Sequence, residues 1–147
     1  MPVIPYIIVR DAASALDFYA RAFGAEEKFR LTDPADPAGR IGHAEIAIGD
    51  APIMLADEHP EWGAVGPVTL GGTPVSFHLS VADADVAAAR AVAAGATLLR
   101  PVEDQFYGSR SGMVADPFGH KWSISQQTEE LTPEELQRRY ERLLAEK

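Results

Sequence analysis

An internal duplication constrains this chain more than any other feature of its sequence. A valine, an aspartate and an alanine stand at positions 9, 11 and 12, and the same three residues return at positions 81, 83 and 84, an offset of 72. A Gly-Ala pair closes the following segment in both places, at Gly24 and at Gly95. Two copies in 147 residues predict one domain built of two similar modules, whereas a solenoid needs three or more repeats.

Each copy begins as a strand followed by a helix. Residues 3–9 are β-branched and aromatic, which favours a strand, and Asp11 is a typical helix N-cap. Apolar residues then recur at helical spacing as far as Gly24, a typical helix C-terminus. Residues 76–81 and Asp83 open the second copy in the same way.

Three shorter strands follow each helix, separated by turns rich in Gly, Asp and Pro. The expected strands are 26–32, 41–48 and 52–57 in the first copy, and 97–102, 110–115 and 121–126 in the second. The sequence therefore predicts an α+β fold of two tandem βαβββ modules, module 1 at about 3–57 and module 2 at about 74–127. The connector, residues 58–73, is rich in Gly and Pro and is expected to be irregular, and loops of this length are usually functional or mobile.

A C-terminal helix is predicted over residues 132–146. Thr132 and Glu135 form a capping box, with Pro133 at the first helical position. An apolar stripe follows at helical spacing, made of Leu136, Tyr140, Leu143 and Leu144. The stripe fits two positions, either against the sheet of its own chain or against a second subunit.

Composition and charge exclude several functional classes. The absence of cysteine excludes disulfides, thiolate metal sites and a cysteine nucleophile, so a metal site would need His, Asp or Glu. The net charge of −9, with no basic block, argues against nucleic acid as a partner. Residues 3–9 are too short to span a bilayer and lack the basic region of a signal peptide, so we expect a cytoplasmic protein with no membrane partner.

The paired modules, their Val-x-Asp-Ala starts and the Asp-Pro-Phe-Gly-His-Lys-Trp turn at 116–122 together resemble the vicinal oxygen chelate superfamily. That superfamily includes glyoxalases, bleomycin-resistance proteins and extradiol dioxygenases. Residues 41–45 and 54–58 look most like its PhnB-like subgroup. The resemblance covers about residues 3–127. It implies a curved eight-stranded mixed sheet around a cleft, with the helices outside and a ligand inside, and it implies a homodimer.

Enzymes of this superfamily hold a divalent metal through residues near the first strand and on the last strand of each module. Carried over to this sequence, the resemblance puts these positions at Ile4, Ser76 and Ser123, with a fourth near Leu55. Divalent metals in such sites prefer imidazole and carboxylate donors, which none of these residues supplies. We therefore expect no cofactor, and we expect no stoichiometric metal in the purified protein.

Strand alternation predicts which side chains line the cleft instead, because successive residues of a strand face opposite sides. If Ile4 faces the cleft, Tyr6 faces it too, and Ser76 is accompanied in the same way by His78.

The strand at 41–48 adds two further cleft residues. Its apolar set is expected to face the helices, which leaves His43 and Glu45 for the cleft, together with His78. The trio is consistent with a relocated metal site, with general acid–base chemistry in which Glu45 fixes a histidine tautomer, or with a polar lining that orients a ligand. A polar lining is favoured, because ligand pockets routinely carry a few fixed polar groups.

Four other side chains have weaker signals. Trp62, in the connector, can close over the cleft and stack on a flat ligand, or pack on its own subunit or a partner. Arg110 can clamp a carboxylate or phosphate, or pair with an acidic side chain. Trp122 is expected in the core, and Asp116 is expected to serve the geometry of its turn.

These features favour a small-molecule-binding protein that holds a flat or antibiotic-like organic ligand without a metal. The predicted ligand-binding residues are Tyr6, His43, Glu45, Trp62, Ser76, His78, Arg110 and Ser123. The alternative is a metal-dependent or acid–base enzyme, a lyase, isomerase, thiol transferase or dioxygenase, that uses His43, Glu45 and His78. A third reading is an accessory dimer whose cleft is filled by Ile4, Ile8 and Leu55.

Overall fold

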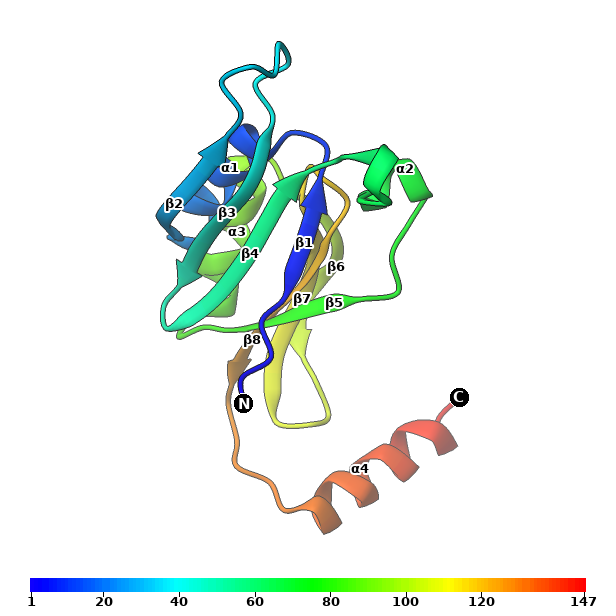
Figure 1. Cartoon of the computed structure of the whole chain (residues 1–147). Coiled ribbons are helices and arrows are strands. Elements are labelled where there is room, and N and C mark those ends of the chain that lie inside the picture. The colour runs from blue at the N-terminus through cyan, green and yellow to red at the C-terminus, as the bar shows by residue number, and fades with distance from the viewer.

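The two halves of the chain fold into the same unit, as the duplication predicts (Figure 1). The computed structural model describes residues 1–147. Module 1 consists of β1 (Tyr6–Val9), α1 (Ala12–Phe23), β2 (Glu26–Thr32), β3 (Ile41–Ile48) and β4 (Ala51–Asp57). Module 2 consists of β5 (Ser76–Ser80), α3 (Ala84–Ala94), β6 (Thr97–Asp104), β7 (Ser109–Ala115) and β8 (Lys121–Gln127). The α+β class and the two βαβββ modules are confirmed.

The eight strands form two separate four-stranded sheets. Sheet 1 has the order β1-β4-β3-β2 and sheet 2 has the order β5-β8-β7-β6. In each sheet the first strand pairs in parallel with the last, and the other pairs are antiparallel. The expected single eight-stranded sheet is therefore not hydrogen-bonded within one chain, because β1 and β5 are both edge strands without a strand partner on their outer side.

Side-chain capping begins both long helices where the sequence predicts. The carboxylate of Asp11 accepts a hydrogen bond from Ser14 N, and that of Asp83 accepts one from Val86 N, each at 3.1 Å. Gly24 ends α1 with a φ of 69°, a left-handed conformation that suits glycine. β1 starts at Tyr6 and not at residue 3, since Pro5 has no N–H to donate to a ladder.

Sheet 1 has one face packed on the helices and one open face, and this division positions the site. Ala44 and Ile46 are buried against the core, as strand alternation predicts. Leu55 is also fully buried on this side, so it neither fills the cleft nor occupies a cleft position. Because Tyr6 pairs with Met54 in parallel register, Met54 and its alternate neighbours share the open face with Tyr6. The expectation that Leu55 belongs to the cleft is wrong by one residue, which inverts the face.

A buried aromatic and polar cluster joins the two modules. Tyr19 of α1 and Trp122 of β8 lie with ring centroids 5.6 Å apart, and both donate hydrogen bonds to the carboxylate of Asp116. His120 Nε2 lies 2.9 Å from the carbonyl oxygen of Ile8 in β1. The core position expected for Trp122 is confirmed, and α1 packs beside α3 across this joint (Figure 1).

The connector contains two short helices, so the expectation of a wholly irregular segment is wrong. A 3₁₀ turn η1 (Pro60–Trp62) and a helix α2 (Pro67–Leu70) each start with proline and end at a glycine of positive φ. Proline at the first helical position and glycine at the end stabilise even one turn.

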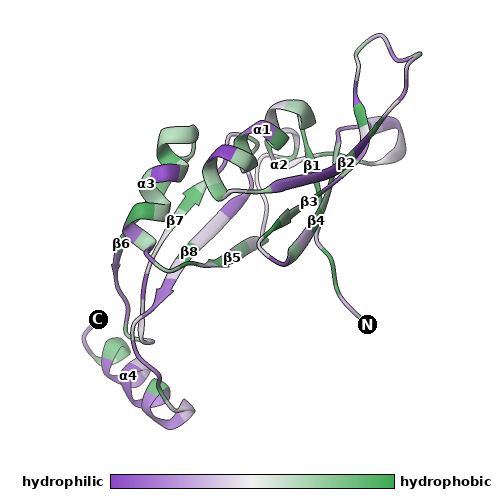
Figure 2. Cartoon of the chain, turned by 90° about the vertical axis from the view of Figure 1, so that its left-hand side faces the viewer, coloured by the Kyte–Doolittle hydropathy of each residue, from purple (hydrophilic) through white to green (hydrophobic).

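The last helix, α4 (Pro133–Ala145), lies apart from both sheets (Figures 1 and 2). Thr132 caps it as predicted, since its Oγ1 accepts a hydrogen bond from Glu135 N at 3.2 Å. None of its residues is fully buried, and Tyr140 contacts the body by stacking on Phe106. Its apolar stripe is therefore mostly uncovered within one chain. No helix of the structure is both long and apolar enough to cross a membrane.

Candidate functional site

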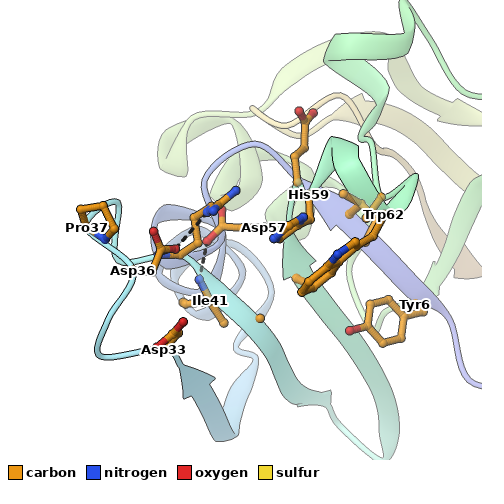
Figure 3. Close-up of a pocket in the computed structure, with 14 residues that line it drawn as sticks. Tyr6, Asp33, Asp36, Pro37, Ile41, Asp57, His59 and Trp62 are labelled. Carbon is orange, nitrogen blue, oxygen red and sulfur yellow. Dashed lines mark hydrogen bonds and ion pairs between the residues drawn. The ribbon is translucent and has the colours of Figure 1, made fainter.

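A cavity of about 590 Å³ lies on the open face of sheet 1, and we call it the first cavity (Figure 3). Its floor is formed by Tyr6 and Ile8 of β1 and Ala56 of β4. The connector supplies one wall through His59 and Trp62. The opposite wall is the β2–β3 loop, with Asp33, Asp36, Pro37 and Arg40.

The connector is held over β1 by backbone and side-chain hydrogen bonds. Glu58 Oε1 accepts hydrogen bonds from Gly66 N at 3.1 Å and from Thr69 Oγ1 at 2.6 Å. A Cβ atom on Gly66 would lie 2.8 Å from the carbonyl oxygen of Ile8, so only glycine allows this approach. His59 and Ala64 pair as an isolated β-bridge, which closes the loop that carries Trp62.

His59 and Trp62 form a flat aromatic wall. Their ring centroids are 3.5 Å apart and their planes differ by 3°. Residues three apart in a 3₁₀ turn are eclipsed, which explains why these two rings stack. Trp62 remains 78% exposed, so the indole face that His59 does not cover is open to the cavity and solvent. Trp62 thus lies at the edge of the first cavity and packs on His59 of its own chain, so the structure leaves open both roles that the sequence allows for it.

The opposite wall is made rigid by carboxylates. Asp57 accepts hydrogen bonds from Ala12 N at 2.8 Å and from Ile41 N at 2.7 Å, which ties β4 to α1 and β3. Asp36 pairs with Arg40 at 2.9 Å. The hydrogen bond from Arg40 lowers the pKa of the Asp36 carboxyl, so Asp36 stays ionised at neutral pH.

Tyr6, His43 and Glu45 form a hydrogen-bonded chain on the open face of sheet 1. The hydroxyl of Tyr6 lies 2.9 Å from His43 Nδ1, and His43 Nε2 lies 2.8 Å from Glu45 Oε2. A neutral His43 protonated at Nε2 satisfies both contacts, because it accepts from Tyr6 and donates to the carboxylate. Partial burial and the charge of Glu45 raise the pKa of Tyr6, so its hydroxyl remains the donor. The shared face of these three residues is as the sequence predicts.

His78 lies elsewhere. It lines a second cavity of about 480 Å³ over sheet 2, with Ser80, Tyr107, Ser125 and Gln127 among its neighbours. No three His, Asp or Glu side chains are grouped so that they could hold a metal ion. The structure therefore brings His43 and Glu45 together and leaves His78 out, because the two sheets turn separate open faces to solvent.

Of the predicted ligand-binding residues, Tyr6 and Trp62 line the first cavity, whereas His43, Glu45, Ser76, His78, Arg110 and Ser123 do not. Ser123 pairs with His78 in the β5–β8 register, and Ser76 lies one alternate position away on the same face. Arg110 donates hydrogen bonds to Asp85 at 2.7 Å and to Asp104 at 3.3 Å, so its guanidinium is engaged with acids of its own chain.

The residues present do not fit the divalent metal of the superfamily. The corresponding positions hold Ile4, Ser76 and Ser123, which offer one alkyl group and two hydroxyls, and the fourth, near Leu55, lies on a buried strand face. Such a site requires carboxylate or imidazole donors, and these four positions supply none.

Sequence reasoning missed much of the wall of the first cavity. His59 lies in the connector, which the sequence predicts only as an irregular segment, and Asp33 and Asp36 lie in an expected turn between strands. The spacing of His59 and Trp62 around a proline-initiated turn is the one signal that could have paired them. No local sequence pattern indicates that the β2–β3 loop lies opposite the connector.

The comparisons with known proteins agree with this fold. The family described as "Glyoxalase/Bleomycin resistance protein/Dioxygenase superfamily" matches residues 3–124, and the chain belongs to it. The uncharacterized protein Mb0911c of Mycobacterium bovis is 45% identical over 136 residues, which covers 90% of this chain and 88% of that protein.

Two solved structures share the architecture. Protein PA1353 of Pseudomonas aeruginosa has a TM-score of 0.70 at 25% identity, over 88% of this chain and 99% of that one. The PhnB protein of Bacillus cereus has a TM-score of 0.64 at 14% identity, over 86% of this chain and 99% of that one. The second likeness is one of fold alone.

Proposed function

We propose that this protein binds a small organic ligand in the first cavity and that it does so without the metal of its superfamily. The observation that carries the proposal is the cavity itself, about 590 Å³ on the open face of sheet 1, with Trp62 at its edge. Its volume falls within the range of about 300–1,000 Å³ that is usual for small-molecule sites. We also propose the PhnB-like subgroup, on the segments 41–45 and 54–58.

The lining supports a ligand with a flat ring. Tyr6, His59 and Trp62 supply aromatic surface, and Ile8 and Ala56 supply an apolar floor. Aromatic side chains give large contact areas with little conformational freedom to lose on binding. The hydrogen-bonding groups of Tyr6 and His59 can orient such a ring.

Calorimetric titration with a panel of planar organic compounds tests this proposal. We expect at least one compound to bind, and we expect Trp62→Ala to weaken its binding by about tenfold or more. Leu99→Ala, which removes an exposed apolar side chain from β6 outside the cavities, is the matched control and should leave affinity unchanged. Equal affinity for the Trp62→Ala variant would show that the ligand binds elsewhere, and a panel without any binder would contradict the proposal.

Elemental analysis of the purified protein tests the metal-free part. We expect no stoichiometric divalent metal. One zinc, iron, manganese or nickel ion per chain, lost on His43→Ala, would instead support a relocated metal site.

The Tyr6–His43–Glu45 chain favours a second candidate, an acid–base enzyme. A carboxylate that fixes a histidine tautomer, with the other ring nitrogen facing a hydroxyl, is an arrangement suited to proton transfer. Each ligand found by calorimetry is incubated with the protein and recovered for mass spectrometry. Unchanged ligand supports binding alone, whereas a product that disappears with His43→Ala and Glu45→Gln supports the enzyme.

A further inference from the structure

We infer that the first cavity selects an organic cation that carries a flat ring over its neutral and anionic counterparts. This inference rests on the proposed function, because it names the chemical class of the ligand at the same site.

The lining of the first cavity has an excess of negative charge. Four of its residues are acids, Asp33, Asp36, Asp57 and Glu58, and one is a base, Arg40, so its formal charge is −4 + 1 = −3 with His59 neutral. Arg40 is neutralised by its contact with Asp36 at 2.9 Å. No free cation of the lining therefore remains to bind an anionic group.

The four acids differ in whether their oxygens are already hydrogen-bonded within the protein. Both oxygens of Asp57 accept backbone hydrogen bonds, and both oxygens of Asp36 are engaged by the loop and by Arg40. Asp33 uses Oδ1 for Ala35 N, and Glu58 uses Oε1 for Gly66 N and Thr69 Oγ1. The second oxygens of Asp33 and Glu58 have no partner in the protein, so these two carboxylates are the ones available to a cation.

The aromatic wall adds an attraction of the same sign. The face of an indole ring is electron-rich and attracts cations, and Trp is the strongest of the aromatic side chains in this respect. His59 covers one face of Trp62, and Trp62 as a whole remains 78% exposed. The two stacked rings are shown in Figure 3. His59 Nδ1 is itself buried and forms no hydrogen bond, although Glu61 Oε2 lies 2.7 Å away outside hydrogen-bond geometry.

The second cavity lacks this combination. Its polar lining consists of hydroxyls, an amide, His78 and one acid, Glu129, which pairs with Arg139 at 2.9 Å. The first cavity therefore combines carboxylate oxygens that have no partner with a stacked aromatic pair, and the second cavity does not.

Three probes of one shape test the inference by calorimetry: N-methylacridinium, acridine at a pH where it is uncharged, and acridine carboxylate. We expect N-methylacridinium to bind about tenfold more tightly than acridine and acridine carboxylate to bind most weakly. Added salt should weaken the binding of the cation and leave that of acridine nearly unchanged.

Charge variants locate the preference. The double variant Asp33→Asn/Glu58→Gln removes both negative charges but keeps a side-chain oxygen at each position to accept the loop hydrogen bonds. It should reduce the preference for the cation over acridine to about twofold. Asp50→Asn with Glu134→Gln removes two exposed carboxylates outside the cavity and should keep the full preference.

The outcomes separate the inference from the proposed function. If acridine or its carboxylate binds as tightly as the cation, and binding still depends on Trp62, the inference is wrong and the proposed function stands. An unchanged preference in the Asp33/Glu58 variant also overturns the inference. If none of the three probes binds while another planar compound binds through Trp62, the inference is wrong and the proposed function stands.

Discussion

Asp116 is a buried carboxylate whose four hydrogen bonds connect its own turn to both modules. Oδ1 accepts from Phe118 N at 2.9 Å and from His120 N at 3.0 Å, which is the turn role that the sequence predicts. Oδ2 accepts from the Tyr19 hydroxyl at 2.6 Å and from Trp122 Nε1 at 2.9 Å. The bond from Tyr19, which lies 97 residues away, has no local sequence signal.

Replacing Tyr19 by phenylalanine should destabilise the protein without changing its shape. Burial and the neighbouring Asp116 raise the pKa of Tyr19 well above its ordinary value, so the hydroxyl keeps its proton and donates at neutral pH. Loss of a buried hydrogen bond to a carboxylate costs about 1.5–3 kcal/mol. Urea unfolding of Tyr19→Phe should show this decrease in the free energy of unfolding.

Tyr140→Phe is the matched control for this prediction. Tyr140 is 46% exposed and its hydroxyl makes no hydrogen bond, so the change should have almost no effect on stability. If the two variants are equally stable, Asp116 does not depend on Tyr19, and the joint between the modules rests on apolar packing alone.

At the scale of elements, an ion pair connects α3 to sheet 2. Arg110 of β7 lies 2.7 Å from Asp85 in the first turn of α3. Its hydrogen bond lowers the pKa of Asp85 from the ordinary value of 3.8. Of the two roles that the sequence left open for Arg110, the structure shows the pairing with acids.

This pair should make a small part of the stability dependent on pH. A carboxyl whose pKa is lower in the folded state stabilises the protein above its unfolded pKa, and the contribution is lost as the pH falls through the folded pKa. Arg110→Gln should therefore lower the melting temperature by about 1–3 °C at neutral pH, and the difference from wild type should disappear in acid as Asp85 becomes protonated, at a pH below its ordinary pKa of 3.8.

Arg100→Gln serves as the control, because Arg100 is an exposed arginine of β6 without an ion pair. It should leave the melting temperature unchanged at either pH. A difference between Arg110→Gln and wild type that persists in acid would mean that the guanidinium acts through packing and not through its charge.

At the scale of the whole molecule, we propose a homodimer that covers the open faces of the sheets. Every residue of β2 is exposed, and the open face of sheet 1 carries Phe29 and Leu31, which are 42% and 57% exposed. The apolar stripe of α4 is also largely uncovered. Exposed apolar surface of this extent is typical of an association surface.

Light scattering should give a mass of two chains, and Leu31→Glu should shift the equilibrium toward the monomer, because a charge would be buried at the interface. Arg30→Glu is the control, because Arg30 pairs with the buried Ala44 and so lies on the other face of β2, and it should leave the dimer intact. A monomer at every concentration would contradict the proposal, as would a Leu31→Glu variant that dimerises as well as the wild type.

The sequence by itself determined the duplication, the helix caps at Asp11, Asp83 and Thr132, and the face on which Tyr6, His43 and Glu45 lie. These features depend on interactions within a few residues or on the two-residue period of a strand, so a linear pattern contains them. A slip of one residue was enough to assign Leu55 to the wrong face.

Only the tertiary structure decided which segments meet. It divided the strands between two sheets, separated His78 from His43, brought the β2–β3 loop opposite Trp62, and placed Tyr19 against Asp116. Each of these outcomes depends on how surfaces distant in sequence pack together, and residue spacing contains no information about that packing.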